Sequence, residues 1–380
     1  MPETIASLDP LQCYGCRACE GICPAHCIRM EKNAEGFFYP HLDESACVQC
    51  GKCAAACPGL HPADYPYAPR AYAAVNTDEE TRSTSSSGGV FFPVARQILR
   101  RNGVVFGVEF DENFLAQHAF AETEEDARAF CRSKYMQSDT RDSFIKAKEF
   151  LDAGRPVLFT GTACQIAGLK QYLGHEYDNL YTIDLICGGV ASPALWQKYL
   201  QSFRKGKPQD VSFRDKSDGW YHFALKISFS DGTDYRCEFR KNPYMEMFLH
   251  GFSIRECCYR CGFRQQHIAA DLTIADFWGI DEVLPQLNDD RGISVVLSDT
   301  EKGEALLQNA PELSLTPVDL EKALQRNRMS RERRKRFPRR DKYLKALPHR
   351  GFKYLYNKCY NSTHTEVLKS KVAKLIGYKS

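Results

Sequence analysis

Short apolar segments alternate with polar, turn-rich segments over residues 70–190, in the order expected of an α/β domain. Four apolar runs have the length of buried strands, and they lie at residues 70–76, 104–108, 156–160 and 180–185. Two further segments, 90–100 and 166–173, place apolar side chains at helical spacing, and Asn102-Gly103 ends the first of them. Because strands and helices alternate, the pattern predicts a mixed α/β domain.

Two runs of closely spaced cysteines precede this domain. The pattern C-x2-C-x2-C-x3-C-P is formed first by Cys13, Cys16, Cys19 and Cys23, and again by Cys47, Cys50, Cys53 and Cys57. Such a doubled run is typical of bacterial ferredoxins with two [4Fe–4S] clusters, in which the fourth cysteine of each run ligates the other cluster. We therefore expect cluster one to use Cys13, Cys16, Cys19 and Cys57, and cluster two to use Cys47, Cys50, Cys53 and Cys23.

Zinc is the alternative for clustered cysteines. A zinc site takes four tetrahedral ligands, commonly as two separated pairs, so eight cysteines in a doubled run favour the clusters. Cys27 lies outside both runs and receives no role. A two-cluster module usually connects a second redox centre to an outside one-electron donor. The three prolines within residues 61–70 indicate a linker to that second part of the chain.

A Ser/Gly-rich loop separates the first predicted strand of the larger domain from its first predicted helix. The loop ends in Ser86-Ser87-Gly88-Gly89-Val90. Exposed amides at a helix N-terminus bind anions, and glycines let a phosphate approach closely. Taken alone, the pattern favours an ordinary helix N-cap over a phosphate site.

Four later cysteines form a second candidate metal site. Cys164 and Cys187 each follow the end of a predicted strand, where ligands gather in open α/β sheets. Cys258 and Cys261 form a C-x2-C pair further along the chain. The four together could ligate a third cluster, whereas the alternative for each single cysteine is a buried structural thiol.

Several motifs, taken in order, resemble the coenzyme F420 hydrogenase/dehydrogenase beta-subunit family, whose relatives include 7-hydroxymethyl chlorophyll a reductase. The resemblance covers about residues 1–300, with the cysteine-rich module as an N-terminal extension. The matching motifs are Ser86-Ser87-Gly88-Gly89-Val90, Ser133-Lys134-Tyr135, Gly161-Thr162-Ala163-Cys164-Gln165, Asp184-Leu185-Ile186-Cys187, Cys258-Tyr259-Arg260-Cys261, Ala275-Asp276-Phe277-Trp278-Gly279 and Gly292-Ile293-Ser294.

The resemblance implies a bound FAD beside an additional [4Fe–4S] cluster, which makes three clusters in all. The implied cluster ligands are Cys164, Cys187, Cys258 and Cys261. The implied flavin-binding residues are Ser86, Ser87, Gly88, Gly89, Val90, Lys134, Gly161, Thr162 and Asp276. Lys134 is also the implied catalytic residue, because a nearby cation would stabilise a reduced, anionic flavin. The alternative for Lys134 is a solvated surface lysine.

The chain departs from the family pattern at several positions near the implied cluster. Gly188 stands where relatives often have His, which removes a possible proton donor, and Ala163, Ala191 and Ala275 replace Pro, Pro and Gly. Cys257, beside Cys258, is an extra thiol that could compete as a ligand.

The cysteine runs and the family resemblance together predict a redox function. The resemblance implies an iron–sulfur flavoprotein oxidoreductase that exchanges electrons with ferredoxin or another one-electron donor. Its small-molecule substrate would be coenzyme F420 or another organic compound, with surface-polysaccharide biosynthesis as one setting. The alternative is an electron-transfer subunit that has no substrate site and relays electrons to a partner enzyme.

Charge divides the chain unevenly. Residues 318–380 hold 19 Lys and Arg against 5 Asp and Glu, a net +14, so the remainder carries −11. This basic helical tail could dock an acidic ferredoxin or pack on its own acidic body. Residues 365–376 have the pattern of a basic amphipathic helix, which would make peripheral membrane contact. No nucleic-acid motif is present, and nucleic acid is not an expected partner.

Hydropathy and the predicted boundaries complete the picture. No apolar run reaches the roughly 18 residues that span a bilayer, and the first residues lack a signal-peptide pattern, so a cytoplasmic protein is expected. The predicted organisation is a ferredoxin-type domain at 1–60, a linker at 61–70, a mixed α/β flavin and iron–sulfur domain at 71–317, and the basic tail at 318–380.

Overall fold

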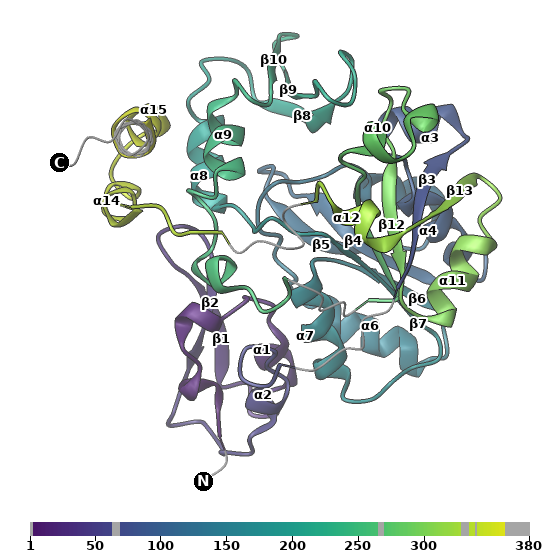
Figure 1. The fold of residues 1–380 in the computed structure, drawn as a ribbon. Helices are drawn as coiled ribbons and strands as arrows, with labels where there is room; N and C mark the ends of the chain where they lie inside the picture. Colours follow the sequence, from purple (N-terminus) through teal and green to yellow (C-terminus); the bar gives the residue numbers. More distant parts are fainter. Residues whose placement is uncertain (1–2, 63–68, 265–269, 328–333, 339, 362–380) are drawn as a thin grey trace, which may run out of the picture.

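A mixed sheet of eight strands runs through the larger part of the molecule (Figure 1). The computed structural model describes residues 3–62, 69–264, 270–327, 334–338 and 340–361. The strand order is β13-β3-β12-β11-β7-β6-β4-β5. The strands are β3 (Arg70–Asn76), β4 (Val104–Phe110), β5 (Ala116–Ala121), β6 (Val157–Thr160), β7 (Leu180–Leu185), β11 (Leu272–Asp276), β12 (Ser294–Ser298) and β13 (Leu313–Val318).

The four central strands β11, β7, β6 and β4 are parallel, and the outer strands are added by antiparallel pairing. β3 is separated from β11 by two antiparallel steps and so runs in the same direction as the central strands. The loops that follow β3, β6, β7 and β11 therefore meet at one edge of the sheet, which we call the carboxyl edge.

The four predicted strands are confirmed as β3, β4, β6 and β7. The two predicted helices are confirmed as α4 (Phe91–Leu99) and α7 (Ala163–Leu173). α7 begins three residues earlier than predicted because of a capping box, in which the Thr162 amide donates to Gln165 Oε1 at 2.9 Å. The helix ends at Gly174, whose φ of 75° suits glycine.

Helices cover both faces of the large sheet. One face packs against α4 and α11 (Glu301–Gln308), and the other against α6 (Ser143–Asp152), α7, α10 (Ile280–Val283) and α12 (Leu320–Leu324). Alternation within β4 shows why, since Val105 packs on the first face and Phe106 on the second. Four short helices also lie in the loops of this sheet, namely α3 (Glu79–Thr84), α5 (Glu124–Ala127), η3 (Arg128–Phe130) and η5 (Pro285–Leu287).

A second, antiparallel sheet follows β7 in the sequence. It consists of β8 (Pro208–Asp215), β9 (Ala224–Phe229) and β10 (Asp234–Glu238), with α8 (Pro193–Leu200) and α9 (Pro243–Leu249) beside it. The elements α14 (Arg340–Ala346), α15 (Phe352–Tyr354) and η6 (Leu355–Asn361) pack alongside α8 and α9 (Figure 1). Trp196 and Tyr244 share a buried cluster there with Tyr343 and Tyr360.

The segment expected to be a basic tail thus supplies part of a hydrophobic core over its described residues. The first of these residues, Val318, closes β13 of the large sheet, so the predicted boundary at 317 lies inside an element. The predicted amphipathic segment 365–376 lies outside the described residues. Of the helices that the structure describes, none has the length and apolar character required to cross a membrane.

The N-terminal module lies at one end of the molecule, next to α7 (Figure 1). It contains η1 (Ile5–Ser7), η2 (Pro10–Gln12), α1 (Ala18–Ile22), the hairpin β1 (Ile28–Lys32) and β2 (Phe38–Leu42), and α2 (Lys52–Ala55). Six of the nine buried residues in its core cluster are cysteines. Thr140 Oγ1 donates to the Cys16 carbonyl at 3.0 Å, and Gln137 Nε2 donates to the Tyr14 carbonyl at 2.9 Å, so the module is bonded directly to the larger domain.

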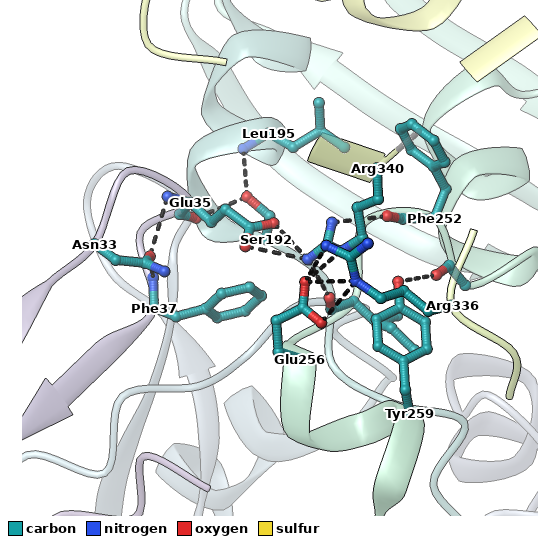
Figure 2. A network of polar contacts seen from close by, with 12 residues as sticks. Asn33, Glu35, Phe37, Ser192, Leu195, Phe252, Glu256, Tyr259, Arg336 and Arg340 are labelled. Atoms are coloured by element: carbon teal, nitrogen blue, oxygen red, sulfur yellow. Dashed lines mark hydrogen bonds and ion pairs between the residues drawn. The ribbon is translucent and has the colours of Figure 1, made fainter. Parts of the chain in front are cut away.

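Arg340 joins the module, the larger domain and the C-terminal segment in one buried network (Figure 2). Its side chain is fully buried and pairs with Glu35 of the β1–β2 hairpin at 2.8 Å and with Glu256 at 3.0 Å. It also donates to the carbonyls of Phe252 and Ile254. Burial raises the pKa of Glu35 to about 7, although Arg340 acts to lower it. The hairpin is therefore held by a cation from the far end of the sequence.

We expect Arg340→Met to lower the free energy of unfolding by about 3–5 kcal/mol, because it leaves a buried carboxylate without its partner. Arg336→Met is the matched control. Arg336 also pairs with Glu256, but its side chain is 39% exposed, so the expected loss is below about 1 kcal/mol. Guanidinium unfolding of anaerobically purified protein measures both changes. Equal losses would contradict the assignment of Arg340 as the anchor.

Candidate functional site

The two cysteine runs share one backbone conformation. Gly15 and Gln49, at the same position in each run, have φ values of 70° and 54°. Arg17 and Gly51 also correspond, with φ values of 63° and 74°. Each positive-φ residue turns the chain so that the flanking cysteines can face a common centre. The repeat in the sequence is therefore also a repeat in the structure.

A cavity lies at the second run and is lined by Cys23, Cys47, Cys50 and Cys53, which are the four ligands predicted for cluster two. The Ile5 amide donates to Cys53 Sγ and the Gln49 amide donates to Cys47 Sγ, both at 3.4 Å. Amide donors of this kind stabilise ligating thiolates. The residues present therefore fit an iron–sulfur cluster.

Cys27 lines the same cavity, with its Sγ 3.4 Å from Cys23 Sγ. Sequence reasoning gave this residue no role, because it lies outside both runs. Its position only four residues after Cys23, a predicted ligand of cluster two, was the one feature of the sequence that indicated a place near that cluster.

The predicted ligands of cluster one are more buried than those of cluster two, and the first run faces the larger domain. Cys13, Cys16, Cys19 and Cys57 are all buried, whereas Cys47 is partly exposed and Cys50 is exposed. Burial raises the pKa of Cys16 to about 12. Cys16 lies against α7 at Gly168, where an added Cβ would be 2.8 Å from Cys16 Sγ. The glycine thus permits the close contact between the module and α7.

The other four predicted ligands come together near the carboxyl edge. Cys164 lies in the first turn of α7 after β6, and Cys187 follows β7. The helix η4 (Glu256–Arg260) carries Cys258, and Cys261 follows it directly. Burial, and after it the charges of Cys261, Cys187 and Cys258, raise the pKa of Cys164 well above its usual value. Burial, and after it the charges of Cys258 and Cys261, also raise the pKa of Cys187, and a Cβ added at Gly189, two residues after Cys187, would lie 3.3 Å from Cys258 Cβ, so the four thiols are close enough to influence one another.

Polar contacts to these sulfurs also fit a ligand role. The Gly189 amide donates to Cys187 Sγ at 3.3 Å, and the Thr162 hydroxyl lies 3.2 Å from Cys164 Sγ. The neighbouring thiol of Cys257 is the main cause that lowers the pKa of Cys258 to about 7. No disulfide is formed by any of the seventeen cysteines. Within the described ranges, no three His, Cys, Asp or Glu side chains are grouped as ligands of a single metal ion.

The two segments predicted to meet a flavin lie side by side. The Ser133 amide donates to Ser86 Oγ at 2.8 Å, so the Ser-Lys-Tyr segment is bonded to the Ser/Gly loop. Gly88 has a packing role, because an added Cβ would be 2.3 Å from the Ala74 carbonyl of β3. Gly89 has a φ of 81° and lets the chain turn into α4.

Lys134 is engaged within its own loop. Its Nζ donates to the carbonyls of Ala129, Cys131 and Arg132 at 2.8, 2.9 and 3.2 Å. Burial lowers the pKa of Lys134 to about 7. The lysine is therefore not a simple solvated residue, and its three bonds hold the loop that contacts Ser86.

Asp276, at the end of β11, forms a buried ion pair that the sequence did not indicate. Arg214 Nη1 and Nη2 donate to its two carboxylate oxygens at 2.7 and 2.9 Å, and Trp220 Nε1 donates to Oδ1 at 2.9 Å. Lys216 lies nearby and donates to the Ser87 carbonyl at 3.2 Å. Burial lowers the pKa of Lys216 to about 8. Arg214 and Lys216 were missed because single cations at a strand end form no motif.

The remaining predicted residues, Gly161 and Thr162, form the turn between β6 and α7. An added Cβ at Gly161 would be 3.1 Å from Gln165 Oε1, the group that caps α7. Both residues thus lie beside Cys164 at the carboxyl edge, where they start α7.

Two family models match parts of this chain. Residues 154–319 match the family model for the C-terminal part of the coenzyme F420 hydrogenase/dehydrogenase beta subunit, and residues 12–59 match the family described as "4Fe-4S dicluster domain". The two matches together define the class as an iron–sulfur protein that combines a 4Fe-4S dicluster domain with a domain of the coenzyme F420 hydrogenase/dehydrogenase beta-subunit type. The match over residues 154–319 confirms the resemblance to the coenzyme F420 hydrogenase/dehydrogenase beta subunit that the sequence motifs indicated, and the match over residues 12–59 confirms the dicluster pattern of the N-terminal module.

Two individual proteins are similar over part of the chain. NADH-quinone oxidoreductase subunit I of Pelobacter propionicus is 38% identical over 56 residues, which cover 13% of this chain and 30% of that protein. A chain of the F420-reducing [NiFe] hydrogenase complex from Methanosarcina barkeri aligns with 67% of this chain and 85% of its own length, at 16% identity and a TM-score of 0.44.

The packing role of Gly88 can be tested with a matched glycine. We expect Gly88→Ala to lower the free energy of unfolding by about 1–3 kcal/mol, because the added methyl group meets the backbone of β3 and β12. Gly351→Ala is the control, since an added Cβ there meets nothing within 4 Å, and its expected change is within about 0.5 kcal/mol. Denaturant unfolding measures both. A tolerated Gly88→Ala would show that the loop is free to shift.

Proposed function

We propose that this chain is an iron–sulfur flavoprotein oxidoreductase. It would pass electrons between a ferredoxin-like donor, three [4Fe–4S] clusters and one FAD, and reduce or oxidise coenzyme F420 or another small organic substrate. The observation that carries the proposal is the position of the second cysteine group, formed by Cys164, Cys187, Cys258 and Cys261. Cys164 and Cys187 follow β6 and β7 at the carboxyl edge, which also bears the Ser/Gly loop after β3, and Tyr14 of the module packs against Phe263, two residues after Cys261, with ring centres 5.3 Å apart.

Each implied group has identified residues for its binding. The eight cysteines of the doubled run would hold two clusters, and the later four would hold the third. The Ser86 to Val90 loop, with Gly161 and Thr162, would face the flavin. When bound, the clusters would supply one-electron transfer and the flavin would couple it to two-electron chemistry.

The protein's own groups would control charge at this site. Lys134 and Lys216 place two ammonium groups against the backbone of the loops around Ser86 and Ser87. Burial lowers the pKa of each lysine, so small changes in their surroundings alter the positive charge near the loop. Arg214 remains charged and is balanced by Asp276.

A relay subunit without a substrate site is the second candidate. It is favoured by the bonding of Lys134 and Asp276, which are engaged with loop carbonyls and with Arg214. In that case, electrons would leave to a partner enzyme. A dissociable small molecule that bleaches the flavin of the isolated protein would support the enzyme, whereas a strict need for a second protein would support the relay.

The amounts of iron and FAD bound per chain test whether the proposed cofactors are present. We expect about twelve irons and one FAD per chain in anaerobically purified protein, from three four-iron clusters and one flavin. Iron assay and the flavin absorbance of the released cofactor measure these amounts. About eight irons with no flavin would leave only the dicluster module and would contradict the proposed role of the larger domain.

Variants of single cysteines test the third site. We expect Cys164→Ser or Cys261→Ser to lose about four irons per chain while the clusters of the doubled run remain, because their ligands lie elsewhere. Cys257→Ser is the matched control and should keep its full iron content. If Cys257→Ser loses iron and Cys258→Ser does not, Cys257 is the ligand instead.

A further inference from the structure

One buried arginine connects the first cysteine run to the second cysteine group. Arg255 is fully buried. Its backbone belongs to the loop of the second group, because the Cys258 amide donates to the Arg255 carbonyl and the Arg255 amide donates to the Val190 carbonyl, both at 3.0 Å. Any movement of this arginine is therefore shared with Cys258.

The side chain of Arg255 extends in the opposite direction, into the N-terminal module. Its Nε donates to the Cys13 carbonyl at 2.8 Å, and its Nη2 lies 3.4 Å from Cys13 Sγ. Nη2 also donates to the Phe38 carbonyl at 2.8 Å, and Nη1 donates to Gln137 Oε1 at 2.9 Å. The guanidinium stacks over the ring of Tyr39, 4.0 Å from its centre. The head group is thus fixed on all sides.

The module leaves room for this contact at Gly15. An added Cβ at that position would be 2.8 Å from Arg255 Nη1, and the φ of 70° also favours glycine. The contact at Gly168 brings Cys16 onto α7 one helical turn after Cys164, which is about 6 Å along the helix axis. Two independent close contacts therefore place the first run beside the second cysteine group.

The positive charge of Arg255 lies beside Cys13 Sγ and has no carboxylate among its hydrogen-bond partners. Arg214 and Arg340 are two other deeply buried arginines, and each is paired with a carboxylate. The hydrogen-bond partners of Arg255 are carbonyl and amide oxygens and the sulfur of Cys13. Glu35 is close enough to be influenced by Arg255, but it is bonded to Arg340.

We propose that Arg255 is a positioning residue that fixes the first cysteine run against the second cysteine group and raises the reduction potential of the cluster held by Cys13. This inference rests on the proposed function. When bound, that cluster would accept one electron from the one-electron donor, and its net charge would become more negative by one. A fixed, desolvated cation with a hydrogen bond to the sulfur stabilises the added charge.

The test is a potentiometric titration followed by electron paramagnetic resonance on the purified, cluster-loaded protein. We expect Arg255→Met to make reduction of one dicluster-module cluster at least tenfold less favourable, which is about 59 mV for a one-electron couple. Cluster two is an internal control, because the hydrogen-bond partners of Arg255 include none of its predicted ligands Cys23, Cys47, Cys50 and Cys53. Arg255→Lys keeps the charge but not the planar fork, so it should recover part of the shift.

Arg17→Met is the matched control variant. Arg17 lies at the same interface and pairs with Asp139 at 2.5 Å, but it is balanced by carboxylates. We expect this variant to change the equilibrium constant for reduction of the same cluster by less than about threefold. If Arg255→Met does not fold, Arg255→Lys decides the matter. Full iron content with unchanged potentials in the Arg255 variants would overturn this inference, whereas a wild-type protein without clusters would overturn the proposed function instead.

Discussion

The stability of the N-terminal module depends on metal bound to the sulfur atoms of its cysteines. Its core is formed by cysteines together with Ile5, Leu8 and Ile28, so few purely apolar side chains are available to stabilise it. A module of this size buries little surface, and small modules usually require metals or cross-links. Without metal, six buried thiols replace what would be apolar core residues. Folding of this module and cluster binding are therefore expected to be coupled.

The sheet and helix α7 of the larger domain fix the positions of the two groups of cysteines. Its parallel strands end at one edge, so Cys164, Cys187 and the Ser/Gly loop lie at the same edge of the sheet although they are far apart in the sequence. The packing of α7 then connects this edge with the module, because Cys164 and the contact point at Gly168 lie on one helix. The same elements that build the sheet also fix the relation between the two groups of cysteines.

Local signals explain which parts were predictable. The strands β3, β4, β6 and β7 were visible as short apolar runs, and the doubled cysteine run is self-contained within about 45 residues. The ionic contacts were not visible, because their partners are far apart along the chain. Arg255 and Cys13 are separated by 242 residues, and Arg340 and Glu35 by 305. A lone arginine in a sequence gives no indication of a partner at that distance.

The placement of Arg340 has a consequence for how the protein is made. A chain emerges from the ribosome with its N-terminus first, so the module with its two cysteine runs appears long before the residues that secure its hairpin. Arg340 and the aromatic side chains of Tyr343 and Tyr360 are among the last of the described residues to be synthesised. Gln137, Thr140 and Arg255 are available to the module earlier, but its hairpin lacks the Arg340 anchor until nearly all of the described residues have been synthesised.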